Sequence, residues 1–189
     1  SLLRVQWRRD TEDGEVAWTE ARNGNATLQT VAEGEDPGLV SLGLHERVVG
    51  PLDSAGLASV VFSDIQGNPV EQNVLDATAA FRAHDADGVV GLGGGSALDV
   101  TKAVRLRATH ELPLEEYDEY VEGWKKTHAD VPPMIAIATT AGTGSEVGRA
   151  AVITLASTNR KTVLFSPHLM PNVAVLDPEL TVGLPPTLT

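Results

Sequence analysis

Hydrophobic positions along the chain follow two alternating periods. Short apolar runs predict strands, and apolar positions three or four residues apart predict helices between them. The predicted strands cover residues 58–62, 89–92, 134–138, 151–155, 161–165 and 173–176. The predicted helices cover residues 39–56, where Pro51 should end the helix early, 70–84 and 96–106, with near-helical spacing again over 111–130. Strands alternating with helices favour an α/β fold with a mainly parallel sheet and flanking helices, whose ligands bind beyond the carboxyl ends of the strands.

The first 35 residues have a different pattern of apolar and polar positions. Leu3, Val5 and Trp7 alternate with polar residues, as do Val16 and Trp18, and the residues between these two stretches are turn formers. This pattern predicts a β-hairpin. We therefore divide the chain into an atypical N-terminal segment, residues 1–35, and one α/β domain, residues 36–189.

Two glycine-rich loops each follow a predicted strand directly. The first runs from Gly91 to Ser96 and the second from Thr139 to Glu146. Residues without a Cβ let backbone N–H groups approach an anion closely, and a loop that opens a helix adds the positive end of the helix dipole. We expect a phosphate and ribose cradle for a dinucleotide, with Ser96 capping the following helix and Asp99 in its first turn.

Each loop also has a plainer interpretation. The first reads Gly91-x-Gly93-x-x-Ser96, which lacks the third glycine of the usual dinucleotide fingerprint, so a tight turn without a ligand stays an alternative. The second contains four hydroxyl side chains and two glycines within seven residues, more hydrogen-bonding capacity than a turn needs. An ordinary capped helix start is its alternative.

Composition narrows the classes of partner. The 189 residues carry a formal net charge of −12, contain no cysteine, and include no apolar run long enough to cross a bilayer. We expect a cytoplasmic protein that binds neither nucleic acid nor membrane, because net repulsion opposes a phosphate polymer. An anionic cofactor stays compatible, since local N–H groups act at short range while salt screens distant charges beyond about 8–10 Å. The histidines show no metal-ligand spacing and are assigned to structure or surface: His45, His84, His110, His128 and His168.

Three long motifs resemble the iron-containing (group III) alcohol dehydrogenases. They are Gly93–Asp99 with Lys102, Thr139–Val147, and Asp177–Thr181 with Leu184–Pro186, in the order and spacing of that family. The resemblance implies a Rossmann-like, dehydroquinate synthase-like amino-terminal domain that binds NAD(P). It also implies that the helical carboxyl-terminal domain, which supplies an aspartate and three histidines to iron or zinc, is absent from this chain.

The same resemblance implies a set of cofactor-binding residues and no catalytic or metal-binding residue in this chain. Glycines and hydroxyls would hold the pyrophosphate, and Val152 and Lys161 would lie near the nicotinamide ribose. Asp36 would accept a hydrogen bond from the adenosine ribose and favour NAD over NADP, although no strand is recognisable directly before it. The full set is Asp36, Asn68, Gly94, Gly95, Ser96, Asp99, Thr139, Thr140, Thr143, Ser145, Val152, Lys161 and Leu180.

The function implied is that of the cofactor-binding half of a metal-dependent enzyme. It would move hydride between a small alcohol or aldehyde and NAD(P), with a divalent metal only in the complete protein, and family habit implies a homodimer. This chain alone should be inactive, because it lacks the metal that stabilises the alkoxide. The alternative is a non-catalytic dinucleotide-binding fragment, or a packing partner that needs a separate metal-binding half.

Overall fold

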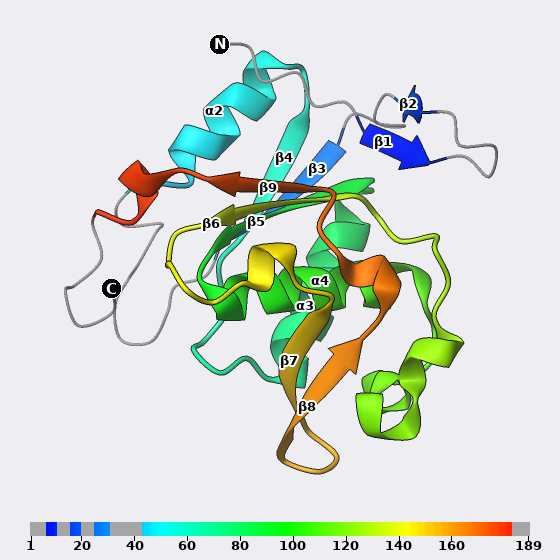
Figure 1. Cartoon of the computed structure of the whole chain (residues 1–189). Coiled ribbons are helices and arrows are strands. Elements are labelled where there is room, and N and C mark those ends of the chain that lie inside the picture. The colour runs from blue at the N-terminus through cyan, green and yellow to red at the C-terminus, as the bar shows by residue number, and fades with distance from the viewer. Residues whose placement is uncertain (1–6, 11–15, 20–24, 31–42, 183–189) are drawn as a thin grey trace.

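Five parallel strands form the central sheet of the protein (Figure 1). The computed structural model describes residues 7–10, 16–19, 25–30 and 43–182. In the sheet the order is β4-β3-β5-β6-β9. The bounds are β3 (Asn25–Thr30), β4 (Ala58–Phe62), β5 (Gly88–Gly93), β6 (Met134–Ala138) and β9 (Val173–Leu176). The parallel α/β sheet predicted from the sequence is therefore confirmed.

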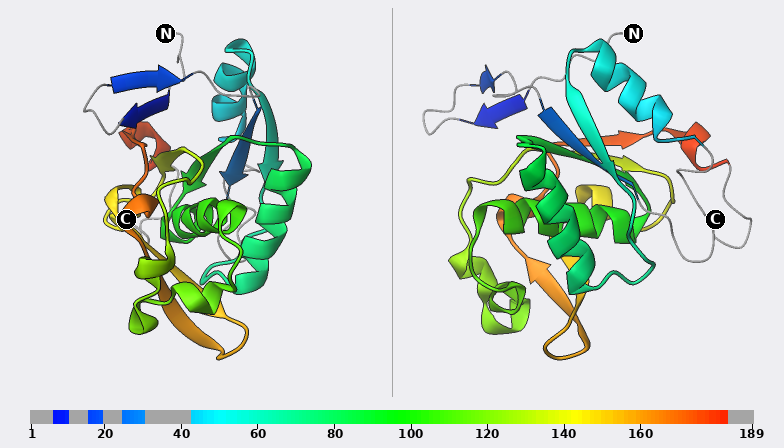
Figure 2. Two further views of the ribbon diagram at one scale, coloured as in Figure 1. Left: turned by 90° about the vertical axis from the view of Figure 1, so that its right-hand side faces the viewer. Right: turned by 180° about the vertical axis from the view of Figure 1, so that it is seen from behind.

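Helices cover both faces of this sheet (Figure 2). Helix α2 (Glu46–Ser54) packs on one face, and α3 (Glu71–Ala83) and α4 (Gly95–Thr109) pack on the other. Side chains along β5 and β6 alternate between the two faces, as the strand period requires. Val89 belongs to the core beneath α3 and α4, whereas its neighbour Val90 belongs to the core beneath α2. The residues that the structure describes thus form a hydrophobic core on each face of the sheet.

A hairpin connects β6 to β9 in place of a helix. Strands β7 (Ala150–Leu155) and β8 (Arg160–Phe165) pair antiparallel, close to the predicted ranges. The hairpin packs on the side of α4 away from the sheet, where Ile153 joins the same core as α4 (Figure 1). Two short 3-10 helices flank the hairpin, η4 (Ser145–Val147) and η5 (Pro167–Leu169), and a third, η6 (Pro178–Leu180), follows β9.

The N-terminal segment contains both an expected and an unexpected element. Strands β1 (Trp7–Asp10) and β2 (Val16–Thr19) form the predicted antiparallel hairpin. Strand β3, however, lies inside the main sheet, paired with β4 on one side and β5 on the other. The sheet thus begins before residue 36, where the sequence pattern indicates no strand. Pairing on both sides orders this mostly polar stretch, whose period is too weak to be recognised.

Helix α2 differs from its prediction at Pro51. The expected early end does not occur, because α2 continues through Pro51 to Ser54. Proline has no N–H, so the turn before it loses one helical hydrogen bond. Burial compensates, since Leu52 is 2% exposed and forms a core with Val90 and Leu92 of β5.

The segment between α4 and β6 forms three short 3-10 helices where near-helical spacing suggested one helix. They are η1 (Leu114–Tyr117), η2 (Glu119–Val121) and η3 (Gly123–Lys126). Glu122 has a φ of +51°, which interrupts any continuous helix. At Gly123 the chain packs so closely on the backbone of Tyr117 that a Cβ would overlap it. This close backbone approach, and not the local spacing, sets the path of the segment.

Candidate functional site

The two glycine-rich loops lie against each other at the carboxyl ends of β5 and β6. The N–H of Thr139 donates to the carbonyl of Gly93 over 3.0 Å. A Cβ built on Gly95 would lie 3.5 Å from the side chain of Thr143. Segments more than forty residues apart in sequence therefore form one surface, as the motifs predict.

Helix α4 begins in this surface without a side-chain cap. Gly94 is its N-cap residue, and Gly93 has a φ of +148°, a conformation that disfavours residues with a Cβ. The sequence predicts Ser96 as the cap and Asp99 in the first turn, and both predictions are wrong: Ser96 lies inside the first turn and Asp99 beyond it. The N–H groups of the first turn have no intrahelical acceptor, so this end of α4 attracts an anion.

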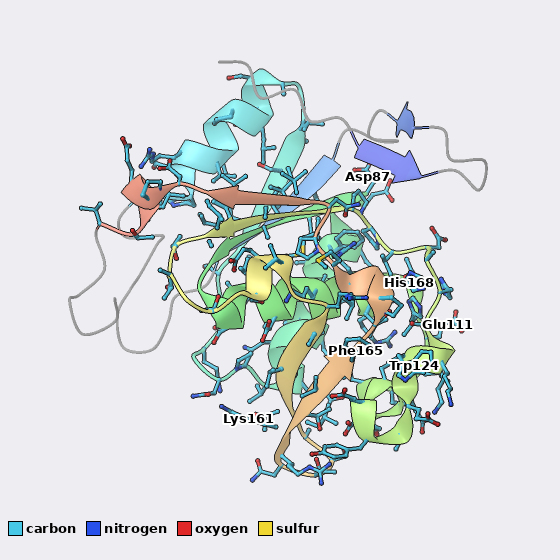
Figure 3. All side chains as sticks on the ribbon, in the orientation of Figure 1. Asp87, Glu111, Trp124, Lys161, Phe165 and His168 are labelled. Atoms are coloured by element: carbon cyan, nitrogen blue, oxygen red, sulfur yellow. The ribbon has the colours of Figure 1, made fainter. Side chains whose placement is uncertain are left out.

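A cavity of about 210 Å³, which we call the α4 pocket, opens at this helix end. Lys161 of β8 extends toward the loop before α3, where its Nζ donates to Oδ1 of Asn68 over 2.5 Å (Figure 3). The pocket therefore combines a cation, an amide and the start of a helix. Its lining residues are Asn68, Pro69, Gly95, Ser96, Asp99, Val152, Thr154 and Lys161.

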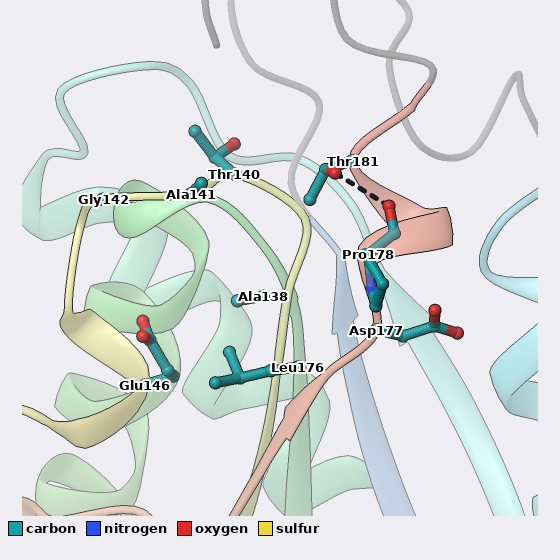
Figure 4. Close-up of a pocket in the computed structure, with 9 residues that line it drawn as sticks. All are labelled: Ala138, Thr140, Ala141, Gly142, Glu146, Leu176, Asp177, Pro178 and Thr181. Carbon is teal, nitrogen blue, oxygen red and sulfur yellow. Dashed lines mark hydrogen bonds between the residues drawn. The ribbon is translucent and has the colours of Figure 1, made fainter.

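A second cavity of about 350 Å³, the β9 pocket, lies along the other side of the second glycine loop (Figure 4). Ala138 forms its floor at the end of β6, and Leu176 of β9, 67% exposed, forms an apolar wall. Glu146 of η4 also lines this pocket. The lining residues are Ala138, Thr140, Ala141, Gly142, Glu146, Leu176, Asp177, Pro178 and Thr181.

A buried lysine of α4 connects this helix to the second glycine loop and to β7. Nζ of Lys102, whose side chain is 1% exposed, donates to Ser145 Oγ over 2.7 Å and to the carbonyl of Ala150 over 2.8 Å. It also lies 3.4 Å from Oδ1 of Asp99. Burial lowers the pKa of Lys102 below its ordinary value, and the Asp99 carboxylate opposes that fall.

Asp99 and Ser145 therefore bond to each other and to the protein. The Ser145 hydroxyl donates to Oδ1 of Asp99 over 2.6 Å, and Oδ2 of Asp99 accepts from the N–H of Val152 over 3.1 Å. Ser145 is 8% exposed, whereas Asp99 reaches the α4 pocket. The sequence motifs contain these residues together with the pocket residues. They do not indicate that Asp99 and Ser145 bond to protein groups.

The structure brings most of the predicted cofactor-binding residues to this surface. Thr139 is buried at 2% exposure between the loops, and Leu180 lies in η6 beside the β9 pocket residues Pro178 and Thr181. Asp36 lies outside the described residues. The predicted residues that line a pocket are Asn68, Gly95, Ser96, Asp99, Val152 and Lys161 in the α4 pocket and Thr140 in the β9 pocket.

Several lining residues were not predicted. Pro69 and Thr154 join the α4 pocket because the N–H of Thr154 donates to the carbonyl of Pro69 over 2.8 Å, a contact without a local sequence signal. In the β9 pocket, Glu146 and Asp177 stand within motifs that the sequence analysis recognised. Their place in those motifs was the available signal.

Other classes of site receive no support from the described part of the chain. Within it, no three histidine, cysteine or carboxylate residues come together in a way that could hold a metal ion. No helix there has both the length and the apolarity required to cross a membrane. His110 serves the structure: its Nε2 accepts from the N–H of His128 over 3.0 Å.

Known proteins are similar to this chain in sequence and in fold. The family model for iron-containing alcohol dehydrogenase matches residues 15–178. A 4-hydroxybutyrate dehydrogenase of Cupriavidus necator is 42% identical over 154 residues, which are 82% of this chain and 40% of that protein.

Two solved structures share the fold. A 1,3-propanediol oxidoreductase has a TM-score of 0.78 and 36% identity, covering 87% of this chain and 41% of its own. A sulfoacetaldehyde reductase from Bifidobacterium kashiwanohense, solved in complex with NAD+, has a TM-score of 0.75 and 33% identity over 87% and 41% of the two chains. The chain thus spans about 40% of the length of these relatives. It belongs to the iron-containing alcohol dehydrogenase family.

Proposed function

We propose that this chain binds NAD(H) across the two pockets, as the cofactor-binding part of an alcohol dehydrogenase. The observation that carries the proposal is the convergence of the uncapped start of α4 and the second glycine loop on one surface. N–H groups at a helix start suit a pyrophosphate. The relative solved with NAD+ has the same fold over 87% of this chain, which supports the assignment.

We propose that different residues at the α4 pocket bind different parts of the cofactor. Gly94, Gly95 and Ser96 would hold the pyrophosphate through their N–H groups. Lys161 and Asn68, already bonded to each other, would reach a ribose hydroxyl in the α4 pocket with Val152 as the apolar wall.

The second glycine loop and the start of η6 would hold the other end of the cofactor. Thr140 lines the β9 pocket, and Thr139, Thr143 and Leu180 lie close to it. Asp36 keeps its predicted role of favouring NAD over NADP. When bound, NAD would supply the acceptor for a hydride from the alcohol carbon.

The substrate we propose is a small primary alcohol or the corresponding aldehyde. The relatives named above are a hydroxybutyrate dehydrogenase and a propanediol oxidoreductase. The iron or zinc of the family would activate the alcohol oxygen. Because the described residues contain no cluster of metal ligands, we place no part of that step on them. We further propose a cytoplasmic homodimer.

A titration of the purified protein with NADH, followed by nucleotide fluorescence, tests the proposal. We expect saturable binding, a Lys161→Met variant with Kd raised about tenfold through loss of a charge-assisted bond, and an unchanged Lys125→Met control. Lys125 is a surface residue paired with Glu122. No fluorescence change at millimolar NADH would overturn the proposal, and a response to NADPH alone would overturn the role of Asp36.

Activity is tested separately. The protein is supplied with Fe²⁺ or Zn²⁺, NAD and 4-hydroxybutyrate or 1,3-propanediol, and NADH formation is recorded. Formation of NADH supports the dehydrogenase. Because the described residues contain no cluster of metal ligands, we expect this chain alone to bind NADH without turnover, and NADH formation only when a metal-binding part is supplied with it.

A further inference from the structure

A lysine buried in the interior requires an explanation in physical terms. Lys102 is 1% exposed, and taking an ammonium group out of water costs several kcal/mol in an unpaired state. The hydroxyl of Ser145, the carbonyl of Ala150 and the carboxylate of Asp99 surround its Nζ. These partners belong to η4, the start of β7 and α4, three of the elements that line the site.

We propose that Lys102 is a positioning residue for the dinucleotide site: its ammonium fastens the second glycine loop and β7 to α4, and it offsets the negative charge of Asp99 at the α4 pocket. The inference rests on the proposed function, because the ligand whose binding it assists is NAD(H). Lys102 does not line either pocket, so it acts through Ser145 and Asp99.

The positioning role follows from the chain of hydrogen bonds. Lys102 holds Ser145 Oγ, Ser145 Oγ donates to Asp99 Oδ1, and Asp99 Oδ2 accepts from the N–H of Val152. Val152 lines the α4 pocket. Ser145 in turn follows Thr143, which packs against Gly95. One ammonium therefore fixes the separation between α4, the second glycine loop and the β7 wall of the α4 pocket.

The charge role follows from the place of Asp99. Its carboxylate lines the pocket in which the proposed function puts phosphate and ribose, and a carboxylate without a cationic partner there would repel the pyrophosphate. Lys102 lies 3.4 Å from this carboxylate on the side away from solvent, where the low dielectric strengthens the interaction. Lys102 thereby offsets part of the negative charge that Asp99 presents to the pocket.

The test compares three variants by NADH titration: Lys102→Met, the double variant Asp99→Asn with Lys102→Met, and Arg105→Met. Arg105 is the matched control, a cation 2% exposed on the same helix. It donates to the carbonyls of Pro132, Leu169 and Met170, none of which lines a pocket. Melting temperatures are recorded for all variants, and titrations are run below the lowest of them.

We expect Kd for NADH to rise at least about tenfold in Lys102→Met, the size seen when one partner of a buried charge pair is lost. The double variant should recover part of this rise, because it removes the unpaired carboxylate, and the remainder should persist, because the ammonium that holds Ser145 and Ala150 is still missing. Arg105→Met should lose stability and keep its Kd. An unchanged Kd in Lys102→Met, an equal rise in Arg105→Met, or no recovery in the double variant would overturn the proposal.

Ser145→Ala keeps the test decisive if Lys102→Met does not fold. This variant retains both charges and removes the hydroxyl that joins them. We expect a rise in Kd of a few-fold and faster amide exchange over residues 143–152, and unchanged values of both would overturn the positioning role. If the parent protein itself fails to bind NADH, the proposed function fails and the variants are not needed to show it.

Discussion

Glycines of similar appearance in the first loop have different physical roles. Gly93 has a φ of +148°, so its conformation requires the absence of a Cβ. Gly91 lies within β5, and a Cβ there would be 2.8 Å from Thr101 Oγ1 and 3.2 Å from Met134 Cε. Its role is the close packing of α4 on the sheet. The sequence motif alone does not separate the glycine that packs a helix from those that prepare a ligand site.

Gly91→Ala tests this distinction through stability. We expect the free energy of unfolding to fall by about 1–3 kcal/mol, because the added methyl overfills a tight contact. Urea denaturation measures it. Gly50→Ala is the control: a Cβ there meets no atom within 4 Å, and alanine at this exposed position of helix α2 should add about 0.5–1 kcal/mol to the free energy of unfolding. Equal unfolding midpoints for both variants would contradict the packing role.

At the scale of elements, His110 holds the three short 3-10 helices to the end of α4. Its Nε2 accepts from the His128 N–H, and its Nδ1 lies 3.0 Å from the carbonyl of Leu106. The His128 ring stacks on it at 3.8 Å between centroids. Only the neutral ring, with its proton on Nδ1, satisfies both contacts. Burial lowers the pKa of His110 below its ordinary value, and electrostatic repulsion from the neighbouring His128 adds to the fall.

This arrangement predicts acid sensitivity. A group whose pKa is lowered on folding contributes stability that is complete above the unfolded value, about 6.5, and is lost as the pH falls below it. The free energy of unfolding should therefore decline from pH 7 to 5.5. In His110→Gln the slope of the unfolding free energy against pH should be smaller, by up to the contribution of one bound proton. The structural cost of the substitution is the difference in unfolding free energy between the two proteins at pH 8. If unfolding free energy depended on pH equally in the parent protein and in His110→Gln, His110 would not be the origin of the acid sensitivity.

The elements also show what local sequence could predict. Strands β4, β6 and β9 appear as apolar runs, and the ends of α3 lie within a residue of the predicted range. Strand β3 was missed because neighbours on both sides order it. The two glycine loops were found by composition. The Lys102 contacts to Ser145 and Ala150 join residues 43 and 48 positions apart, a distance at which a local pattern carries no information.

At the scale of the whole molecule, strand order decides where the site lies. The chain passes from β3 outward to β4, then returns past β3 to continue through β5, β6 and β9. Connections leave in opposite directions on the two sides of this reversal, which creates a crevice at the carboxyl ends of the strands. The first glycine loop follows β5, directly at the reversal. The topology thus predicts the same location as the glycine pattern.

Amide hydrogen exchange tests whether the central strands of the sheet are more stable than the edge strand β9. Every residue of β5 is buried, whereas Val173 and Leu176 of the edge strand β9 are 44% and 67% exposed. We expect amides of β5 and β6 to exchange slowest and those of β9 sooner. Added NADH should slow residues 93–96 and 139–148 with little effect on β4. Uniform exchange across the sheet would show that it opens as one unit and contradict this difference in stability.

Asp99 grips Val152 by the main chain and leaves the side chain of that residue, 37% exposed, facing the cavity. Because the hydrogen bond uses the backbone N–H, it does not depend on which side chain residue 152 carries. Substitutions at this position, natural or engineered, can therefore change the surface of the cavity without breaking the hydrogen bond that holds the strand in place.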